Sequence, residues 1–167
     1  MKLVFQKDAL LNGISIVSKA IPSKTTMTIL ECILINADAN DIKLTGNDME
    51  LGIETKVEGS ILERGKIALE AKLFYEIVRK LPDGNSPVTI TSDNRFNTSI
   101  ECENASFHIQ GRDGDEFSYL PYIERDQHIS LTQFTLKESI RQTIFSISPN
   151  DSNKMMTGEL FEVNGDT

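Results

Sequence analysis

Basic residues lie on the solvent faces of the helices that this sequence predicts, although the formal net charge of the chain is −8. On a helix predicted over 72–81, three basic residues and one acid share a face at positions i, i+4, i+7 and i+8. On a helix predicted over 137–146, two basic residues share a face at i and i+4. The residues are Lys72, Glu76, Arg79, Lys80, Lys137 and Arg141. A positive, helix-lined surface can hold a phosphate backbone without reading the bases. The alternative is an ordinary solvated helix face, because basic residues are common on helix surfaces.

Lys24 adds a positive charge in the polar loop that follows the first predicted helix. The acidic residues gather elsewhere, in predicted turns and strands and in a polar segment over 111–127. The net charge argues against a protein that coats nucleic acid with its whole surface, but it allows contact with DNA through one face.

Residues that could catalyse a reaction are few. His108 and His128 have no cysteine or carboxylate at metal-ligand spacing, and the sequence has neither a glycine-rich phosphate loop nor a nucleophile elbow. Asp48 and Glu50 could be the carboxylate pair of a small-molecule hydrolase, but a turn-capping Asp beside a solvent-facing Glu explains them more simply. We therefore expect no catalytic residue, no metal and no cofactor.

Bulk features indicate a cytoplasmic protein without a membrane anchor. No apolar run approaches the roughly 18 residues that a membrane span needs. The N-terminus meets charge and a helix start too early for a signal peptide. Cys32 and Cys102 lie far apart in alternating segments, which predicts buried free thiols in a reducing cytosol.

The elements that would position the basic residues repeat along the chain. A strand that leads into a helix occurs three times, and its lysines, Lys7, Lys72 and Lys137, are 65 residues apart. A fixed period predicts a structural unit that buries its apolar surface against neighbouring units. The third copy stops at Thr167, so we expect the chain to be part of a longer protein built from such repeats.

Each of the first two repeats predicts a strand, a helix and three more strands, from hydrophobic residues at helical spacing or in alternation. The first repeat comprises strand 1–6, helix 8–19 with Asp8 as N-cap, and strands 29–35, 42–45 and 49–58. The second comprises strand 65–70, helix 72–81, and strands 88–91, 96–101 and 106–110. Together they predict one α+β domain over 1–118.

A polar, turn-rich connector is predicted over 119–128. The large apolar residues over 117–122 are many for a free loop, so we expect them to pack back onto a domain, with a simple surface loop as the alternative. The third repeat, over 129–167, predicts the start of an incomplete second domain. Its elements are strand 129–136, helix 137–146 with Ile140, Ile144 and Phe145 facing inward, and strand 159–163.

Several stretches, in this order and spacing, have counterparts in one known family. They are 1–3 with Leu10 and Leu11, 28–30, Leu44-Thr45-Gly46-Asn47-Asp48-Met49-Glu50-Leu51, 71–74, 79–82, 117–121 and 157–161. Together they cover the chain without large gaps, and they resemble the N-terminal part of the bacterial DNA polymerase III beta subunit family, the sliding clamps.

The resemblance implies a DNA-clamp fold of repeated βαβββ units, with helices on one face and antiparallel sheets outside. It implies a homodimer ring whose subunits each have three domains, and whose helices face duplex DNA. Such a clamp is a non-catalytic processivity factor that tethers the replicative polymerase and is handled by a clamp loader. This chain would lack the rest of domain two, domain three and most of the partner-peptide pocket.

The resemblance also assigns residues to the DNA-facing surface. Lys24, Lys72 and Arg79 match basic positions that face DNA, and Asn150 falls in a second DNA-facing loop. In that loop the family usually has an arginine where Asn153 stands here, so Lys154 supplies the charge one residue late. With the two basic residues of the third repeat, the DNA-facing set is Lys24, Lys72, Arg79, Lys137, Arg141, Asn150 and Lys154.

The strand predicted over 106–110 has two possible roles. By the resemblance, Phe107 on this strand lies at the edge where domain one meets domain three of a second clamp subunit, and Leu73 and Phe74 lie close to that seam. The alternative function is a stand-alone protein-interaction module that binds its partner along the same exposed edge, because an unpaired strand invites strand addition.

Overall fold

The computed structural model describes residues 1–38, 41–84, 86–118, 129–149 and 153–162. The chain divides into two compact units, Met1–Pro121 and Tyr122–Thr167. The division falls inside the predicted connector 119–128, which lies outside the described residues.

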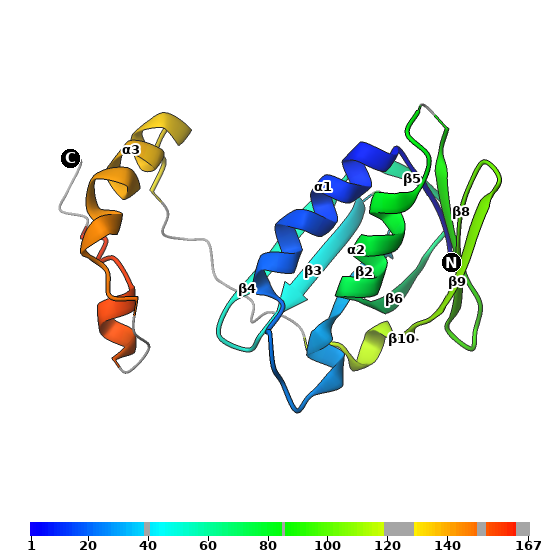
Figure 1. Cartoon of the computed structure of the whole chain (residues 1–167), viewed down its shortest axis with the longest axis horizontal. Coiled ribbons are helices and arrows are strands. Elements are labelled where there is room, and N and C mark those ends of the chain that lie inside the picture. Colours follow the sequence, from blue (N-terminus) through cyan, green and yellow to red (C-terminus); the bar gives the residue numbers. More distant parts are fainter. Residues whose placement is uncertain (39–40, 85, 119–128, 150–152, 163–167) are drawn as a thin grey trace. The chain divides into compact units, whose positions relative to one another are not determined.

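The first unit contains two five-stranded antiparallel sheets, of order β5-β1-β7-β8-β9 and β10-β6-β2-β3-β4 (Figure 1). The strands are β1 (Lys2–Phe5), β2 (Cys32–Asp38), β3 (Asp41–Asn47), β4 (Gly52–Val57), β5 (Gly59–Glu63), β6 (Gly65–Glu70), β7 (Val88–Ser92), β8 (Asn97–Cys102), β9 (Ala105–Gln110) and β10 (Arg112–Asp113). Two successive βαβββ repeats are therefore present, as the sequence predicts.

The two repeats exchange their first strands. β1 begins the first repeat but pairs with β7 of the second, with Lys2 opposite Thr91. β6 begins the second repeat but pairs with β2 of the first, with Glu70 opposite Cys32. Each sheet therefore combines strands of both repeats. Neither repeat can complete a sheet or bury its apolar face alone.

Two helices, α1 (Lys7–Val17) and α2 (Ala71–Lys80), lie side by side over the sheets (Figure 1). α1 packs on β3 and β4, and α2 packs on β6. Their large buried hydrophobic residues recur at helical spacing and are Leu10, Ile14, Val17, Phe74, Ile77 and Val78. Because a fully buried side chain of this size contributes about 1.5–3 kcal/mol, the core fixes which face of each helix points to solvent.

Two local predictions near α1 are wrong. Asp8 does not cap the helix, which begins at Lys7 after Gln6, and no side chain caps this end. The segment predicted to begin a strand at residue 29 forms a 3-10 turn, η2 (Thr28–Glu31). In this turn the backbone N–H of Leu30 bonds to the carbonyl of Met27, so β2 starts only at Cys32.

The predicted strand 49–58 is divided by a turn. The carboxylate of Asp48 accepts the backbone N–H groups of Glu50 and Leu51, and Met49 adopts φ 77°. A carboxylate that serves two successive N–H groups favours a turn over a ladder, so β4 begins at Gly52. The sequence did not predict β5 and β10, which lie at sheet edges and bury few side chains.

Phe117 packs back onto the first unit, as the sequence predicts for the aromatic stretch. Its side chain joins a small cluster with Cys32, Leu34 and Ala68. Beside it, the amide of Asn47 donates to the carbonyl of Ser118 at 3.0 Å. The other aromatic residues of the stretch lie outside the described residues.

The second unit contains α3 (Gln133–Thr143) and the 3-10 turns η4 (Ile144–Ser146) and η5 (Lys154–Thr157). The predicted strand 129–136 is wrong, because the hydroxyl of Thr132 accepts the N–H of Thr135 at 3.1 Å and starts the helix. Residues 159–162 form no strand either, and Val163 lies outside the described residues. The described residues of the second unit include no strand that could pair with either segment, and a strand needs a neighbour for its backbone groups.

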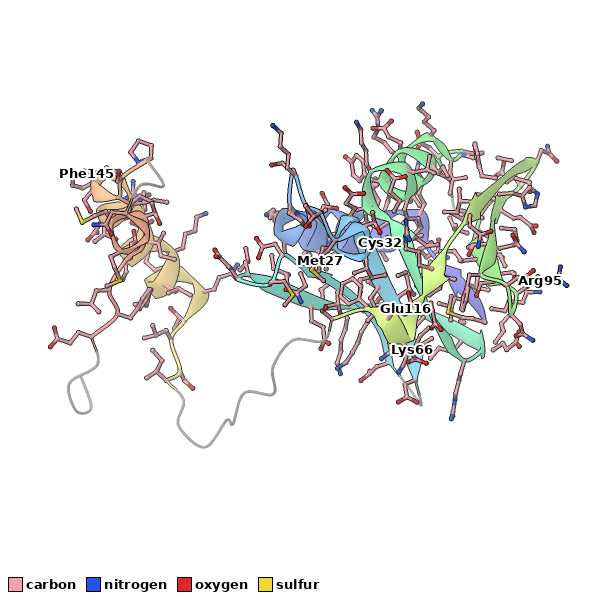
Figure 2. All side chains as sticks on the ribbon, turned by 90° about the horizontal axis from the view of Figure 1, so that it is seen from below. Met27, Cys32, Lys66, Arg95, Glu116 and Phe145 are labelled. Atoms are coloured by element: carbon pink, nitrogen blue, oxygen red, sulfur yellow. The ribbon has the colours of Figure 1, made fainter. Side chains whose placement is uncertain are left out.

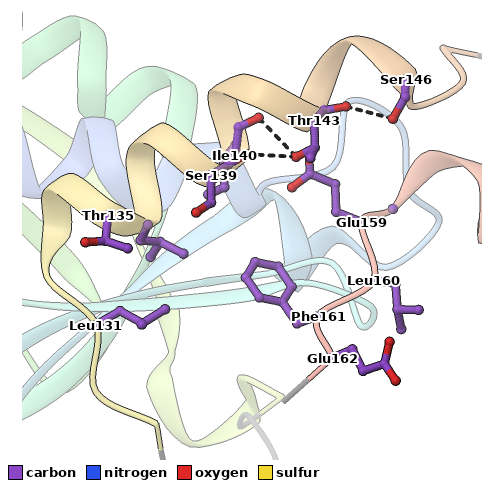
Figure 3. A pocket seen from close by; sticks show the side chains of 12 residues that line it. Leu131, Thr135, Ser139, Ile140, Thr143, Ser146, Glu159, Leu160, Phe161 and Glu162 are labelled. Carbon is purple, nitrogen blue, oxygen red and sulfur yellow. Dashed lines mark hydrogen bonds between the residues drawn. The ribbon is translucent and has the colours of Figure 1, made fainter. Parts of the chain in front are cut away.

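The apolar residues of α3 and η4 are less buried than predicted. Ile140 is half-buried, and Ile144 is exposed. Phe145, which Figure 2 labels, is 84% exposed. α3 instead borders an open pocket of about 470 Å³ whose other wall includes Phe161 (Figure 3). The described residues of this unit provide no sheet for α3 to cover, so its apolar side stays accessible.

Candidate nucleic-acid interface

Lys7 joins the start of α1 to the end of α2. Its side chain is 7% exposed, and Nζ donates to the carbonyl of Leu81 at 2.6 Å and to the carboxylate of Asp83. The last carbonyls of a helix have no partner within the helix, so an ammonium there satisfies a group that is otherwise unpaired. The sequence analysis used Lys7 only to mark the repeat and missed this role.

The solvent face of α2 carries three cations around one carboxylate. Arg79 Nη2 donates to Glu76 Oε2 at 2.7 Å, and Lys80 Nζ lies 3.9 Å from the same oxygen. The hydrogen bond from Arg79 lowers the pKa of the Glu76 carboxyl, and the nearby charges of Lys80 and Lys72 act in the same direction. The predicted basic face is therefore present, but its arginine is already paired with an acid.

Lys24 and Lys72 are less constrained than Arg79. Lys24 is exposed in the loop between η1 (Ser18–Ala20) and η2, and Lys72 is exposed in the first turn of α2. Within the described ranges, neither ammonium group forms an ion pair. A groove between α1 and α2 passes Lys72, and Ser15 and Tyr75 contribute to its walls.

In the second unit, α3 repeats the arrangement of an arginine beside an acid. Arg141 Nη2 donates to Glu138 Oε2 at 2.8 Å, and Lys137 is exposed on the same helix. Lys154 is the first residue of η5, but its side chain is not among those described, and Asn150 lies outside the described residues. The assignment of these residues to a DNA-facing surface stays a prediction.

The strand predicted to carry a subunit seam lies at the edge of its sheet. Among the described strands, β9 pairs only with β8, and Phe107 of β9 is half-buried against the core. Leu73 is 43% exposed, so it can reach a partner. Phe74 is a correction, because it is 0% exposed and fills the core beneath α2; the contrast follows from their positions one residue apart on a helix.

The remaining candidates are Asp48, His108, the two cysteines and His128, of which His128 lies outside the described residues. Asp48 accepts turn N–H groups, as described above, and His108 is exposed on the edge strand β9. Both cysteines are buried and free, as predicted, and burial raises the pKa of the Cys32 thiol. In the part of the chain that the structure describes, no group of three His, Cys, Asp or Glu could hold a metal ion, and no helix is both long and apolar enough to cross a membrane.

Two exchanged repeats with paired helices over antiparallel sheets match one known family. Residues 1–121 match the model of the DNA polymerase III beta subunit, N-terminal domain. The chain belongs to the DNA polymerase III beta subunit family. The match covers the whole first unit, which contains α1, α2 and both sheets.

Curated relatives in this family are similar along almost the whole chain. The beta sliding clamp of Halalkalibacterium halodurans is 37% identical over 98% of this chain and 44% of its own length. The beta sliding clamp of Bacillus subtilis is 37% identical over 98% of this chain and 45% of its own length. The chain thus spans less than half the length of these relatives.

Solved structures of the family have the same fold. A putative DNA polymerase III beta subunit from Eubacterium rectale is 64% identical, with a TM-score of 0.90 over 98% of this chain and 44% of that chain. The DNA polymerase sliding clamp from Bacillus subtilis is 36% identical, with a TM-score of 0.85 over 93% of this chain and 42% of that chain. The predicted α+β clamp fold is confirmed.

Proposed function

We propose that this chain is the N-terminal part of a sliding clamp, the non-catalytic processivity factor that holds the replicative polymerase on duplex DNA in the cytoplasm. The observation that carries the proposal is the family match over residues 1–121, which the relatives extend to 98% of the chain. In this role the protein encloses DNA as a ring of two subunits and meets the polymerase and the clamp loader through parts of a longer protein.

The charge on α2 supports contact with DNA through the helices. Lys72, Arg79 and Lys80 outnumber Glu76 on its solvent face, while the chain as a whole is acidic. A modest positive surface attracts phosphate groups without reading bases, and an acidic exterior discourages binding elsewhere. Lys24, Lys72 and Arg79 are the residues of the first unit that we propose to face DNA.

The edge strand β9 supports either a subunit seam or the alternative function. In the ring, Phe107 and Leu73 would meet the second subunit, and the open edge of β9 would continue into a strand of that subunit. In the alternative, a stand-alone module uses the same edge to bind another protein. The two functions differ in whether the basic helix face matters.

The first experiment measures the intact mass of the protein in its native cell, with an antibody against the first unit. The curated relatives are more than twice as long as the matched segment, so the clamp proposal predicts a species of more than twice 18.7 kDa. A species of 18.7 kDa would contradict the ring and favour the module.

The second experiment replaces Lys24, Lys72 and Arg79 together with alanine in that longer protein. The clamp proposal predicts weaker contact with duplex DNA and a flatter dependence of affinity on salt, because fewer counterions are released. A matched control replaces Lys43, Lys56 and Arg95, which lie on strands β3 and β4 and on the β7–β8 turn. Equal loss in both variants, or no loss in either, would refute the proposed DNA face.

A further inference from the structure

Among the described residues, the arginines of α2 and α3 each make a hydrogen bond to an acid that Lys72 and Lys137 lack. Arg79 is bonded to Glu76 at 2.7 Å, and Arg141 is bonded to Glu138 at 2.8 Å. Both pairs have i, i+3 spacing and lie on the solvent side of their helices, with all four side chains at least 30% accessible. Lys72 and Lys137, on the same helices, form no ion pair with a described residue.

An arginine and a lysine differ in how they hold a phosphate group. The planar guanidinium presents several N–H donors in a fixed fork that matches carboxylate or phosphate oxygens, whereas an ammonium acts as a mobile point charge. A carboxylate three residues away therefore occupies the donors that would otherwise make the most directional bonds to DNA. The lysines keep the non-directional attraction.

Resting on the proposed DNA contact, we infer that Glu76 is an internal competitor of the DNA phosphates for Arg79, and so keeps the grip of α2 on duplex DNA weak. The pair is exposed and weak enough for a phosphate group to displace the carboxylate transiently. Lys80 Nζ lies 3.9 Å from the same carboxylate oxygen, too far for a hydrogen bond, so Arg79 is the cation that Glu76 holds directly. Glu138 has the same relation to Arg141.

The competition explains how a positive surface can allow movement along DNA. A phosphate that replaces Glu76 gains a bond to Arg79 only by breaking an existing one, so the net gain at each step is small. Without the carboxylate, Arg79 would add roughly one phosphate contact, which steepens the salt dependence of log affinity by about 0.9. Between 200 and 50 mM salt, that slope enlarges the gain in affinity by about three- to fourfold.

The test compares Glu76→Gln with the wild-type chain of 167 residues by NMR titration with a short mixed-sequence DNA duplex. Arg79→Ala and the double variant Glu76→Gln/Arg79→Ala complete a mutant cycle. The matched control is Glu54→Gln, which removes the same charge and releases Lys43 from a 2.8 Å ion pair on the sheets. Each dissociation constant is measured at both salt concentrations.

The inference predicts that Glu76→Gln binds the duplex more tightly, that the gain grows at low salt, and that it disappears in the Arg79→Ala background. Glu54→Gln should gain less. If Arg79→Ala weakens binding but Glu76→Gln changes nothing, the competition is refuted while the DNA face stands. If the gain in affinity persists without Arg79, the loss of a negative charge alone explains it, and the competition is refuted. If neither substitution changes binding, the proposed DNA face fails as well.

Discussion

Replacing Lys7 with methionine tests how the two helices are held at their junction. Methionine keeps most of the aliphatic stem of Lys7 in the core but removes the ammonium that donates to Leu81. The carbonyl of Leu81 is buried beside the end of α2, so it would lose its donor without gaining water. We expect the first unit to unfold at a lower urea concentration.

The magnitude follows from the burial of the two acceptors. A buried acceptor left without its hydrogen bond costs about 1–3 kcal/mol, and this term applies to Leu81. Asp83 is 97% exposed at its side chain, so its ion pair with Lys7 adds little. With a slope of about 1–3 kcal/mol per M in urea for a small protein, a loss of about 2 kcal/mol lowers the midpoint by roughly 1 M.

Equilibrium urea unfolding of the wild-type chain, Lys7→Met and Asp83→Asn provides the assay. Asp83→Asn removes the exposed partner and leaves the bond to Leu81, so its midpoint should stay at that of the wild type. The reasoning fails if Asp83→Asn loses as much as Lys7→Met, because the exposed ion pair would then be the stabilising contact. It also fails if Lys7→Met keeps the wild-type midpoint.

Three further predictions concern other parts of the first unit. Hydrogen bonding from Asn97 lowers the pKa of Asp93 from its ordinary 3.8. The ionised carboxylate therefore stabilises the folded state above that value, and this stabilisation is lost as the pH falls through the folded pKa. Between about pH 5 and about pH 2, Asp93→Asn should lose less stability than the wild type in acid unfolding. In Gly46→Ala, the new Cβ would lie 2.4 Å from the carbonyl oxygen of Val17, so we expect a loss of about 1–3 kcal/mol in urea unfolding, and an unchanged midpoint would contradict this close approach. Cys32 and the second buried cysteine should react with a thiol reagent only as fast as the chain unfolds, and rapid labelling of the native protein would show that they are accessible.

The helices and most strands of the first unit were predictable because their signals are local. The spacing of Phe74, Ile77 and Val78 alone predicts which side of α2 is buried. The exchange of β1 and β6 between sheets was not predictable in this way. A strand pattern specifies which face is apolar, but the choice of partner depends on contacts between residues far apart in the sequence.

The third repeat shows the limit of an argument from periodicity. The alternation over 129–136 favours a strand, yet Thr132 provides a helix N-cap within it. In the described second unit no neighbouring strand competes with this local signal, and the helix forms from Gln133. Beside a neighbouring strand, the backbone of the same segment could form hydrogen bonds between strands, and these would favour a strand over the helix.

The candidate site was predicted at the level of residue placement but not of pairing. The i, i+4, i+7 spacing of Lys72, Glu76 and Arg79 correctly predicts a shared face. The spacing does not specify which basic residue forms the hydrogen bond with the Glu76 carboxylate. Both Arg79 and Lys80 lie one turn from Glu76, but Arg79 makes the hydrogen bond, at 2.7 Å, and Lys80 stays 3.9 Å away. Leu73 and Phe74 show the converse error, since neighbouring residues were assigned to one surface although a helix turns them about 100° apart.

The exchange of strands also explains why both helices share one surface. α1 follows β1 in one sheet and leads to β2 in the other, while α2 follows β6 and leads back to β7. Both helices are therefore crossovers between the same two sheets, in opposite directions, and they must lie next to each other. Lys7 fixes the junction of their ends, so the spacing between the solvent faces of α1 and α2 depends on both repeats. A single repeat would lose its sheet partner and also half of the surface that we propose to face DNA.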